Sequence, residues 1–593
     1  MASLEELTYG MNLTAYDPAE LNRALVRLAA EAASRPERAV RGGFQMLLDQ
    51  AGLARELART LLGGSEEPSL QPDAGDRRFA DPAWRDNPWL RAVLGSYLLW
   101  CRWWREQLEA SELDEATRRK AGFALNLALD AAAPTNLPWL NPTVLKQAVD
   151  SGGLSLVRGA VNALTDLVTN NGRPRQVDLT PFELGRNLAA TPGRVVLRNE
   201  LIELLMYEPQ TERVYRNPLL CSPPWINKYY VMDLAPGRSF IEHAVRAGHT
   251  VFAISYRNPD ASLRDFGMED YLNLGWLAAL DAVQTLTGAP RVDVVGLCLG
   301  GTLTGIGLAY LAAHGQQDRI GWATFTNTLL DFREPGDLGV FTDENTLARL
   351  ESRMQQKGYL EASTMAGTFD WLRGNDLVWS YVISNWYLGK QPPAFDILAW
   401  NADSTNMPAA MHAEYLRSCY LENRLASPGA FEIAGTRLDL SQVRVPVYVL
   451  GAQNDHIAPW RGTYRTTQLV GGEARFVLTS AGHIAGIVNP PDNPKTFHYA
   501  RDDCPPDPNA WLEGARKVTR SWWEDWTAWA AERSGDKITP PALPPGEPAP
   551  GRYVRNQVGP PRLLPGMEIS SNGRRQSGER PSEPSRARSR SRR

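Results

Sequence analysis

The sequence is poor in cysteine and has no long apolar run. Its 593 residues include five cysteines at wide, irregular spacing, which fits neither a disulfide framework nor a CxxC metal site. No apolar stretch is long enough to cross a bilayer, and the first residues lack the basic and apolar segments of a signal peptide. We therefore expect a cytoplasmic protein without a membrane span and without a bound metal.

Histidine is scarce as well. The chain has seven histidines, and none precedes His243, so the first third of the chain offers no imidazole base. A formal net charge of −4 gives the molecule as a whole no attraction for nucleic acid. With 43% hydrophobic and 22% charged residues, the composition is that of a globular chain long enough for two or three domains.

The two ends of the chain differ from its middle. Residues 1–200 repeat apolar side chains at helical spacing and predict a helical N-terminal domain. Its most aromatic segment, Trp89–Trp104, is expected to be a core helix; the alternative is a docking face for a second subunit or an apolar product. Residues 541–593 are rich first in Pro and then in Arg and Ser, and predict a disordered tail.

Residues 201–540 alternate predicted strands and helices. This alternation indicates an α/β catalytic domain with a mostly parallel sheet and helices on both faces. Strands are expected at residues 214–221, 250–255, 292–297, 320–326, 443–451 and 474–479. Between about residues 330 and 440 the alternation stops, and helical segments rich in Trp and Tyr predict a cap over the active site.

The stretch Val292–Gly301 carries the strongest chemical signal. A β-branched apolar run predicts a buried strand, and Gly296-Leu-Cys-Leu-Gly300 has the spacing of a nucleophile elbow with Cys298 as the nucleophile. Such a turn needs small neighbours, which explains the three glycines around it. The alternative is a glycine-rich turn that holds an inert, buried cysteine.

A nucleophilic cysteine needs a base, and the base needs an orienting acid. His456 and His483 each follow a predicted strand downstream of the elbow. In folds with this elbow the nucleophile, acid and base follow one another along the chain, which favours Asp455 as the acid and His483 as the base. His456 is the rival base.

Other residues complete or compete with this set. Asp331, which follows the strand expected at 320–326, is the rival acid, whereas Asp260 in Asn-Pro-Asp is expected to be a turn residue. The oxyanion hole would combine the backbone N–H of Leu299 with one from the loop at Pro223–Asn227.

A cysteine in place of serine favours acyl transfer. An S-acyl enzyme keeps its acyl group activated, because exchange between a thioester and a thiol is nearly isoenergetic. The sequence therefore indicates transfer among thioesters and esters, with hydrolysis as the side reaction.

At these residues the chain resembles the polyhydroxyalkanoate synthases, bacterial enzymes of the α/β-hydrolase fold that polymerise (R)-3-hydroxyacyl-CoA into a storage polyester. The resemblance extends from about residue 75 to 555, and the family's catalytic Cys, Asp and His fall on Cys298, Asp455 and His483. The matching segments are Asp76-Arg-Arg-Phe-Ala-Asp-Pro-Ala-Trp, Ser151-Gly-Gly, Asn217-Pro-Leu-Leu, Pro223-Pro-Trp-Ile-Asn-Lys-Tyr-Tyr, Asn258-Pro-Asp, Gly296-Leu-Cys-Leu-Gly-Gly, Trp400-Asn-Ala-Asp-Ser-Thr, Asp455-His-Ile-Ala-Pro-Trp and Gly482-His-Ile-Ala-Gly.

The resemblance implies an activity and its partners. Chain length, the N-terminal domain and the leucines beside Cys298 are similar to the single-subunit class I enzymes, which prefer short-chain substrates such as 3-hydroxybutyryl-CoA. His483 would take the proton of Cys298, and Asp455, alone or with His483, would activate the 3-hydroxyl group of the substrate. No cofactor is implied, since coenzyme A is released from the substrate.

The resemblance also implies a homodimer on the surface of storage granules in the cytoplasm, with no nucleic-acid partner. Two alternatives remain open. One is a cysteine hydrolase of the same fold that acts on thioesters or on the polymer. The other is a granule-associated scaffold whose triad is vestigial.

Overall fold

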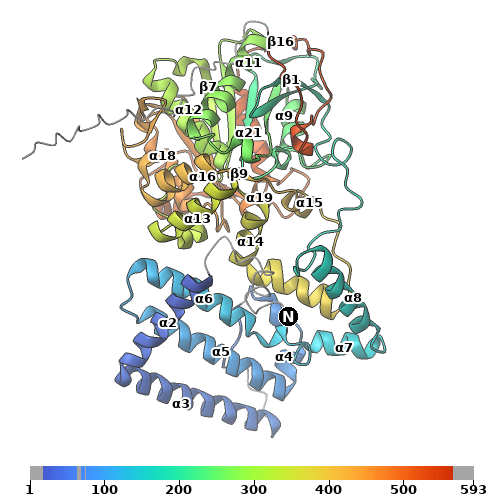
Figure 1. The fold of residues 1–593 in the computed structure, drawn as a ribbon, viewed down its shortest axis with the longest axis vertical. Coiled ribbons are helices and arrows are strands. Elements are labelled where there is room, and N and C mark those ends of the chain that lie inside the picture. The colour runs from blue at the N-terminus through green and yellow to red at the C-terminus, as the bar shows by residue number, and fades with distance from the viewer. Residues whose placement is uncertain (1–17, 63–68, 74, 565–593) are drawn as a thin grey trace, which may run out of the picture.

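The computed structural model describes residues 18–62, 69–73 and 75–564. Helices form the N-terminal region, which lies below the sheet domain in Figure 1. These helices are α2 (Pro18–Ser34), α3 (Pro36–Leu61), α4 (Ala83–Asp86), α5 (Pro88–Glu109), α6 (Glu115–Ala131), α7 (Pro142–Asp150) and α8 (Leu154–Thr169).

Local sequence determines where several of these helices begin. Asn87, Asp114 and Asn141 each accept a hydrogen bond from a backbone N–H of the first turn, and a proline follows Asn87 and Asn141 directly. The prediction of a core helix at 89–104 is correct for only one face of α5, which is buried. Trp89 and Trp100, on its other side, are exposed.

A ten-stranded sheet forms the second part of the molecule, in the order β1-β2-β5-β4-β6-β7-β12-β13-β14-β15. The strands from β5 to β13 pair in parallel, and antiparallel strands extend both edges. They are β1 (Gly193–Arg198), β2 (Ile202–Tyr207), β4 (Leu219–Ser222), β5 (Val251–Tyr256), β6 (Val292–Leu297), β7 (Ile320–Thr326), β12 (Val447–Ala452), β13 (Ala474–Thr479), β14 (His498–Ala500) and β15 (Arg516–Val518).

The sequence did not predict the first antiparallel pair. β1 lies within residues 1–200, which were expected to be helical, and both β1 and β2 are almost wholly buried. A strand buried on both faces loses the alternation of apolar and polar residues, so its period cannot be recognised. The strand expected at 214–221 is divided into β3 (Val214–Tyr215), which pairs with β16 (Lys537–Ile538), and β4.

Helices cover both faces of the sheet, as predicted. One apolar cluster joins the sheet to α11 (Ala278–Thr287) and α12 (Leu299–Ala313), and a second joins it to α9 (Phe240–Arg246) and α21 (Trp522–Ala531). Shorter helices follow the later strands: α17 (Trp460–Tyr464), α18 (Thr466–Leu469), α19 (His483–Ile487) and α20 (Pro508–Gly514). Among the described residues, no helix has both the length and the hydropathy that a bilayer span requires.

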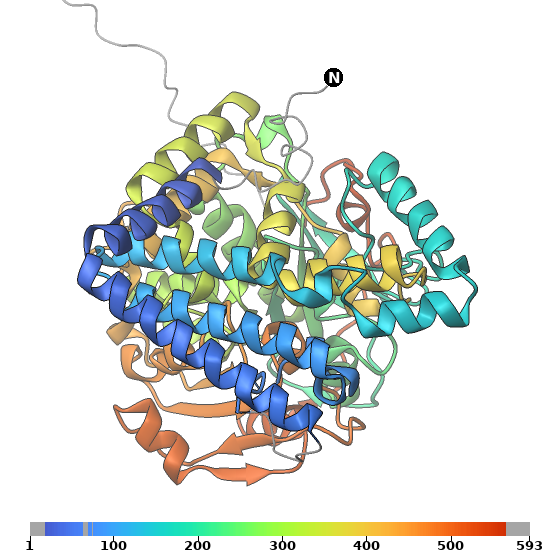
Figure 2. The same cartoon turned by 90° about the horizontal axis from the view of Figure 1, so that it is seen from below.

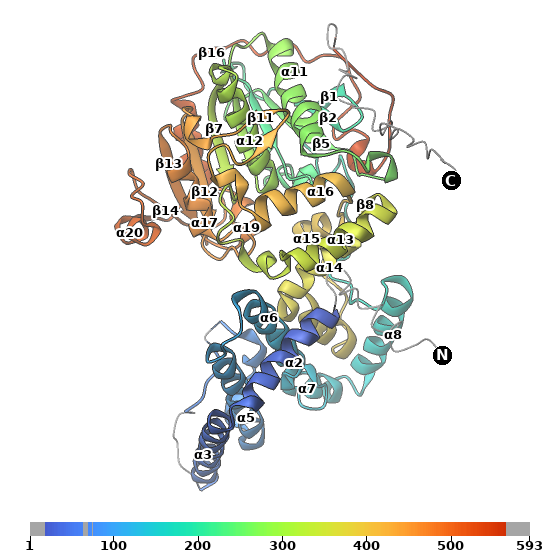
Figure 3. The same ribbon diagram turned by 60° about the vertical axis from the view of Figure 1, so that its left-hand side comes forward.

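The cap lies between β7 and β12 in the chain and between the sheet and the N-terminal helices in space (Figures 1 and 3). It contains α13 (Glu344–Lys357), α14 (Ala362–Leu372), α15 (Asp396–Ala402) and α16 (Ala409–Tyr415), with π-helical turns at Asn375–Trp379, Val382–Tyr387 and Leu416–Leu421. Two short antiparallel pairs that the sequence did not predict complete it: β8 (Tyr359–Leu360) with β9 (Met407–Pro408), and β10 (Glu432–Ile433) with β11 (Thr436–Arg437).

Residues 541–564 correct the prediction of a disordered tail. The N–H of Val195 in β1 donates to the carbonyl of Glu547 at 2.8 Å, the Glu547 carboxylate binds Arg198 at 2.6 Å, and Tyr553 and Val554 are buried. Proline suits this position because an extended chain on the outside of an edge strand needs few N–H groups. The rest of the predicted tail, residues 565–593, lies outside the described residues.

Candidate active site

Cys298 lies at the turn from β6 to α12 in a backbone conformation that side-chain-bearing residues rarely adopt, with φ 50° and ψ −117°. Three backbone hydrogen bonds hold the turn. The Cys298 N–H donates to the Thr326 carbonyl at 2.9 Å, and the Cys298 carbonyl accepts from the N–H groups of Gly301 and Thr302 at 3.0 and 3.1 Å. The predicted elbow is therefore present.

The three glycines of the elbow are required by close contacts. A Cβ atom on Gly296 would lie 2.5 Å from the Cα of Gly301, and one on Gly300 would lie 2.0 Å from the carbonyl oxygen of Ser222. A Cβ on Gly301 would lie 2.0 Å from the hydroxyl oxygen of Thr328. Strand, turn and helix thus approach one another too closely for any larger side chain.

Asp455 and His483 come together behind the elbow. Nδ1 of His483, at the start of α19, lies 2.7 Å from Oδ2 of Asp455. The other carboxylate oxygen accepts the N–H groups of Ile457 and Ala458, both at 2.9 Å. The Asp455 side chain has no exposed surface, so its two oxygens are fixed by these donors.

The surroundings make His483 a stronger base than a free imidazole. Burial by itself would lower its pKa, but the charges of Asp455 and Cys298 and hydrogen bonds with both groups raise the pKa well above the ordinary value. The imidazole therefore faces the carboxylate on one side and the thiol on the other. This arrangement allows a proton to pass between Cys298 and His483.

The rival residues have other partners. Burial, followed by the charge of Arg373, lowers the pKa of His456 to about 4, so this imidazole is neutral near pH 7. The buried Asp331 carboxylate accepts hydrogen bonds from Arg333 and Asn423 at 2.8 and 2.9 Å. Asp260 accepts the N–H of Ser262 at 2.8 Å, which confirms the expected turn residue.

Cys298 and His483 line a cavity of about 1350 Å³. Leu299, together with Pro224, Ile226 and Asn227 of the loop expected to complete an oxyanion hole, lines the same cavity. From the cap come Leu338, Phe341, Trp379, Trp400 and Tyr415, among others. The predicted aromatic cap thus covers the nucleophile, with Trp379 and Trp400 facing the cavity.

The sequence did not reveal that the N-terminal region forms part of the cavity wall. Arg77, Arg78, Asn136, Asn141 and Thr143 line it. The Arg78 guanidinium donates to Asp130 of α6 and to Asn375 of the cap, both at 3.1 Å, and so joins the two regions. No local pattern signals such a role, because arginines are common on solvated surfaces.

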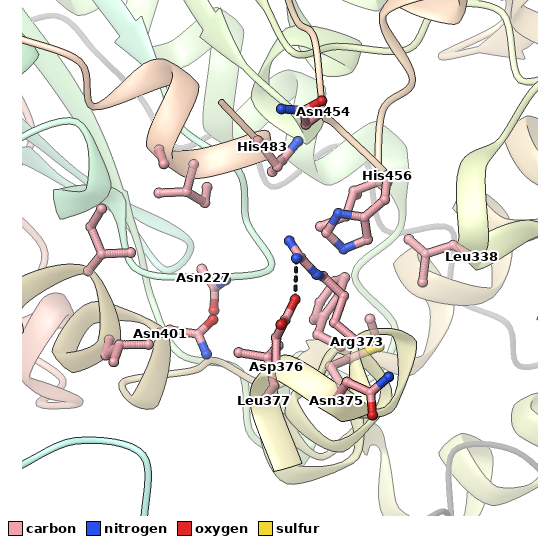
Figure 4. A pocket seen from close by; sticks show the side chains of 18 of the residues that line it. Asn227, Leu338, Arg373, Asn375, Asp376, Leu377, Asn401, Asn454, His456 and His483 are labelled. Carbon is pink, nitrogen blue, oxygen red and sulfur yellow. Dashed lines mark hydrogen bonds and ion pairs between the residues drawn. The ribbon is translucent and has the colours of Figure 1, made fainter. Parts of the chain in front are cut away.

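A charged pair inside the cavity was also missed. Figure 4 shows the Arg373 side chain between His456 and Asp376, with an ion pair to Asp376. Asn227, Asn401 and His483 line the same space (Figure 4). In the sequence, Arg373 and Asp376 are typical of a solvated helix, so nothing marked them as cavity residues.

The nucleophile elbow, the His483–Asp455 pair and the mostly parallel sheet are together typical of the α/β-hydrolase fold. The family model described as "alpha/beta hydrolase fold" matches residues 227–490. A second model, described as "Poly-beta-hydroxybutyrate polymerase (PhaC) N-terminus", matches residues 75–244. The chain belongs to the poly(3-hydroxyalkanoate) polymerase family, as its curated relatives show.

Three relatives illustrate the similarity. Poly(3-hydroxyalkanoate) polymerase 2 of Ectopseudomonas oleovorans is 43% identical over 508 residues, which cover 85% of this chain and 90% of the relative. The poly(3-hydroxyalkanoate) polymerase of Methylorubrum extorquens is 43% identical over 90% of each chain. Poly(3-hydroxyalkanoate) polymerase subunit PhaC of Cupriavidus necator is 42% identical over 81% of this chain and 83% of its own.

Proposed function

We propose that the protein is an acyltransferase that polymerises short-chain (R)-3-hydroxyacyl-CoA, such as 3-hydroxybutyryl-CoA, into polyhydroxyalkanoate with release of coenzyme A. Family membership supports the reaction class. The observation that carries the proposal is the position of Cys298, on a strained elbow beside a buried His483–Asp455 pair and inside a covered cavity.

Acylation follows from this arrangement. His483 takes the thiol proton of Cys298, and the thiolate attacks the carbonyl carbon of the acyl-CoA thioester. The N–H of Leu299, at the start of α12, stabilises the oxyanion. When the carbon–sulfur bond to coenzyme A breaks, His483 returns the proton to the leaving thiolate, and the acyl group remains on Cys298.

Elongation needs a second proton transfer. The 3-hydroxyl oxygen of one hydroxyacyl unit attacks the thioester carbon of another, and Asp455, alone or with His483, removes the hydroxyl proton. An ester bond forms as the carbon–sulfur bond of the attacked thioester breaks, and the proton taken from the hydroxyl passes to the leaving thiolate, which restores a thiol for the next cycle. No cofactor takes part, because the thioester supplies the free energy.

The proposal extends to the assembly of the protein. We propose an active homodimer associated with polyester granules in the cytoplasm, as the family resemblance implies. A water-insoluble product requires the enzyme to work at the boundary between water and an apolar phase.

The test is release of coenzyme A from 3-hydroxybutyryl-CoA by the Cys298→Ala variant. We expect no release, whereas Cys504→Ala, which changes another partly buried cysteine, should retain most activity. Full activity of Cys298→Ala would refute the proposal. Free hydroxy acid without polymer from the wild-type protein would indicate a hydrolase, and no release at all would indicate a scaffold.

A further inference from the structure

Helix α8 is built with its apolar side facing outward. Leu154, Val157, Val161, Leu164 and Val168 are 56% to 83% exposed and repeat at intervals of three and four residues over about 21 Å of helix. The exposed Leu156 and Leu167 widen this stripe to roughly half of the helix circumference. A surface helix normally shows the opposite arrangement, with its apolar stripe against the core.

The inner side of α8 is polar and small, and it fixes the orientation of the helix. The amide nitrogen of Asn162 donates to the carbonyls of Asn385 and Lys390 in the cap at 3.0 and 3.1 Å. Asp166, fully buried, accepts the indole N–H of Trp386 at 2.8 Å. A Cβ on Gly159 would lie 1.9 Å from the Trp386 carbonyl oxygen. Turning the helix over would separate Asn162 and Asp166 from these partners and leave the Trp386 N–H facing apolar side chains, so the apolar stripe stays outside.

The stripe carries almost no charge. Only Arg158 and Asp166 are charged in α8; Asp166 is buried, and Arg158 is exposed beside the stripe, with its Cβ next to Gly389 at the border with the cap. The residues of the stripe themselves therefore offer no charge to a charged partner. Its width exceeds the narrow seam by which one helix packs against another and suits a broad apolar surface.

The position of α8 connects the stripe with the reaction. Asn141 and Thr143, at the start of α7, line the cavity that contains Cys298, and α7 leads through Gly152 and Gly153 into α8. Leu145 and Val149 on α7, which lie between the two in the chain, are exposed apolar residues as well. Figures 1 and 2 show α8 at the side of the molecule, apart from helices α2, α3, α5 and α6.

We propose that the outer face of α8, defined by Leu154, Val157, Val161, Leu164 and Val168, binds the polyester product as it leaves the cavity and holds the enzyme on the polymer surface. This proposal rests on the proposed function, which supplies an uncharged, water-insoluble chain in the cavity beside the start of α7. The face matches such an occupant in polarity, in width and in position.

The test compares two triple variants in the Cys298→Ala background, so that no chain grows during the measurement. One carries Val157→Gln, Val161→Gln and Leu164→Gln. The matched control carries Phe44→Gln, Leu47→Gln and Leu48→Gln, which replace three exposed apolar side chains of α3 in the same helical region. Binding to washed amorphous poly(3-hydroxybutyrate) particles is measured by sedimentation. The α8 variant should lose more than about tenfold in partition coefficient, and the α3 variant should bind like the parent.

Further measurements exclude other occupants. With Cys298 intact, the α8 variant should release coenzyme A at the wild-type initial rate, and light scattering should show an unchanged oligomeric state. Unchanged particle binding, an equal loss in the α3 variant, or loss of a dimer would overturn the proposal. So would loss of binding to phosphatidylcholine vesicles with particle binding retained, which would assign the face to lipid. Particle binding requires no catalysis, so failure of the proposed function would be seen separately in the Cys298→Ala assay.

Discussion

Two histidines next to strand ends differ in their partners, and from this difference we propose that His483 and not His456 acts on Cys298. His483 contacts Asp455 on one ring nitrogen and is affected by the Cys298 thiol, whereas His456 lies near Arg373. We expect His483→Gln to slow acylation of Cys298 by about 10²- to 10⁴-fold, because the thiol loses its base. His456→Gln is the matched control and should acylate at nearly the wild-type rate. The burst of coenzyme A release measures this step, and equal loss in both variants would contradict the assignment.

The carboxylate of Asp455 should control the protonation of His483. Because Asp455 raises the pKa of His483 against the effect of burial, Asp455→Asn should lower that pKa, and the imidazolium should lose its proton at lower pH. NMR titration of the histidine rings in Cys298→Ala protein, with and without Asp455→Asn, measures the shift. A His483 pKa that does not fall would mean that the carboxylate does not influence the base.

Helix α8 packs closely against the cap. Gly159 of α8 faces the Trp386 carbonyl with no space for a methyl group, so Gly159→Ala should force α8 and the cap apart and cost about 1–3 kcal/mol. Gly52 in α3 has nothing within 4 Å of such a methyl group. Gly52→Ala should therefore be neutral or stabilising by up to about 1 kcal/mol. Thermal unfolding of both variants compares them, and equal midpoints would show that α8 packs loosely.

The C-terminal segment packs against the edge of the sheet. Residues 541–564 supply the Glu547 contacts of β1 and bury Tyr553 and Val554, so a chain ending at residue 540 should unfold at lower temperature and lose activity. A chain ending at residue 564 is the control and should keep the stability and polymerisation rate of the full protein. Thermal unfolding and coenzyme A release measure both variants; similar behaviour of the two would show that the segment contributes nothing.

Local patterns in the sequence were enough to predict the elbow and most parallel strands, and the helix starts that the structure shows depend on equally local contacts. Gly296 reflects its contact with Gly301 within one turn, and Asn87 and Asn141 satisfy N–H groups a few residues away. Such features depend on neighbouring residues, so their spacing carries the information. The order of Cys298, Asp455 and His483 along the chain likewise follows from the fold that the elbow indicates.

Only the tertiary structure decided which distant groups meet. It brought Arg78 to Asn375, placed residues 541–564 on the edge of the sheet, and turned the apolar side of α8 outward by holding Asn162 and Asp166 against the cap. In the sequence, α8 is an ordinary amphipathic helix, and nothing local shows which side is buried. The physical reason is that a buried carboxylate or amide needs partners from distant segments, and their positions are determined only when the whole chain has folded.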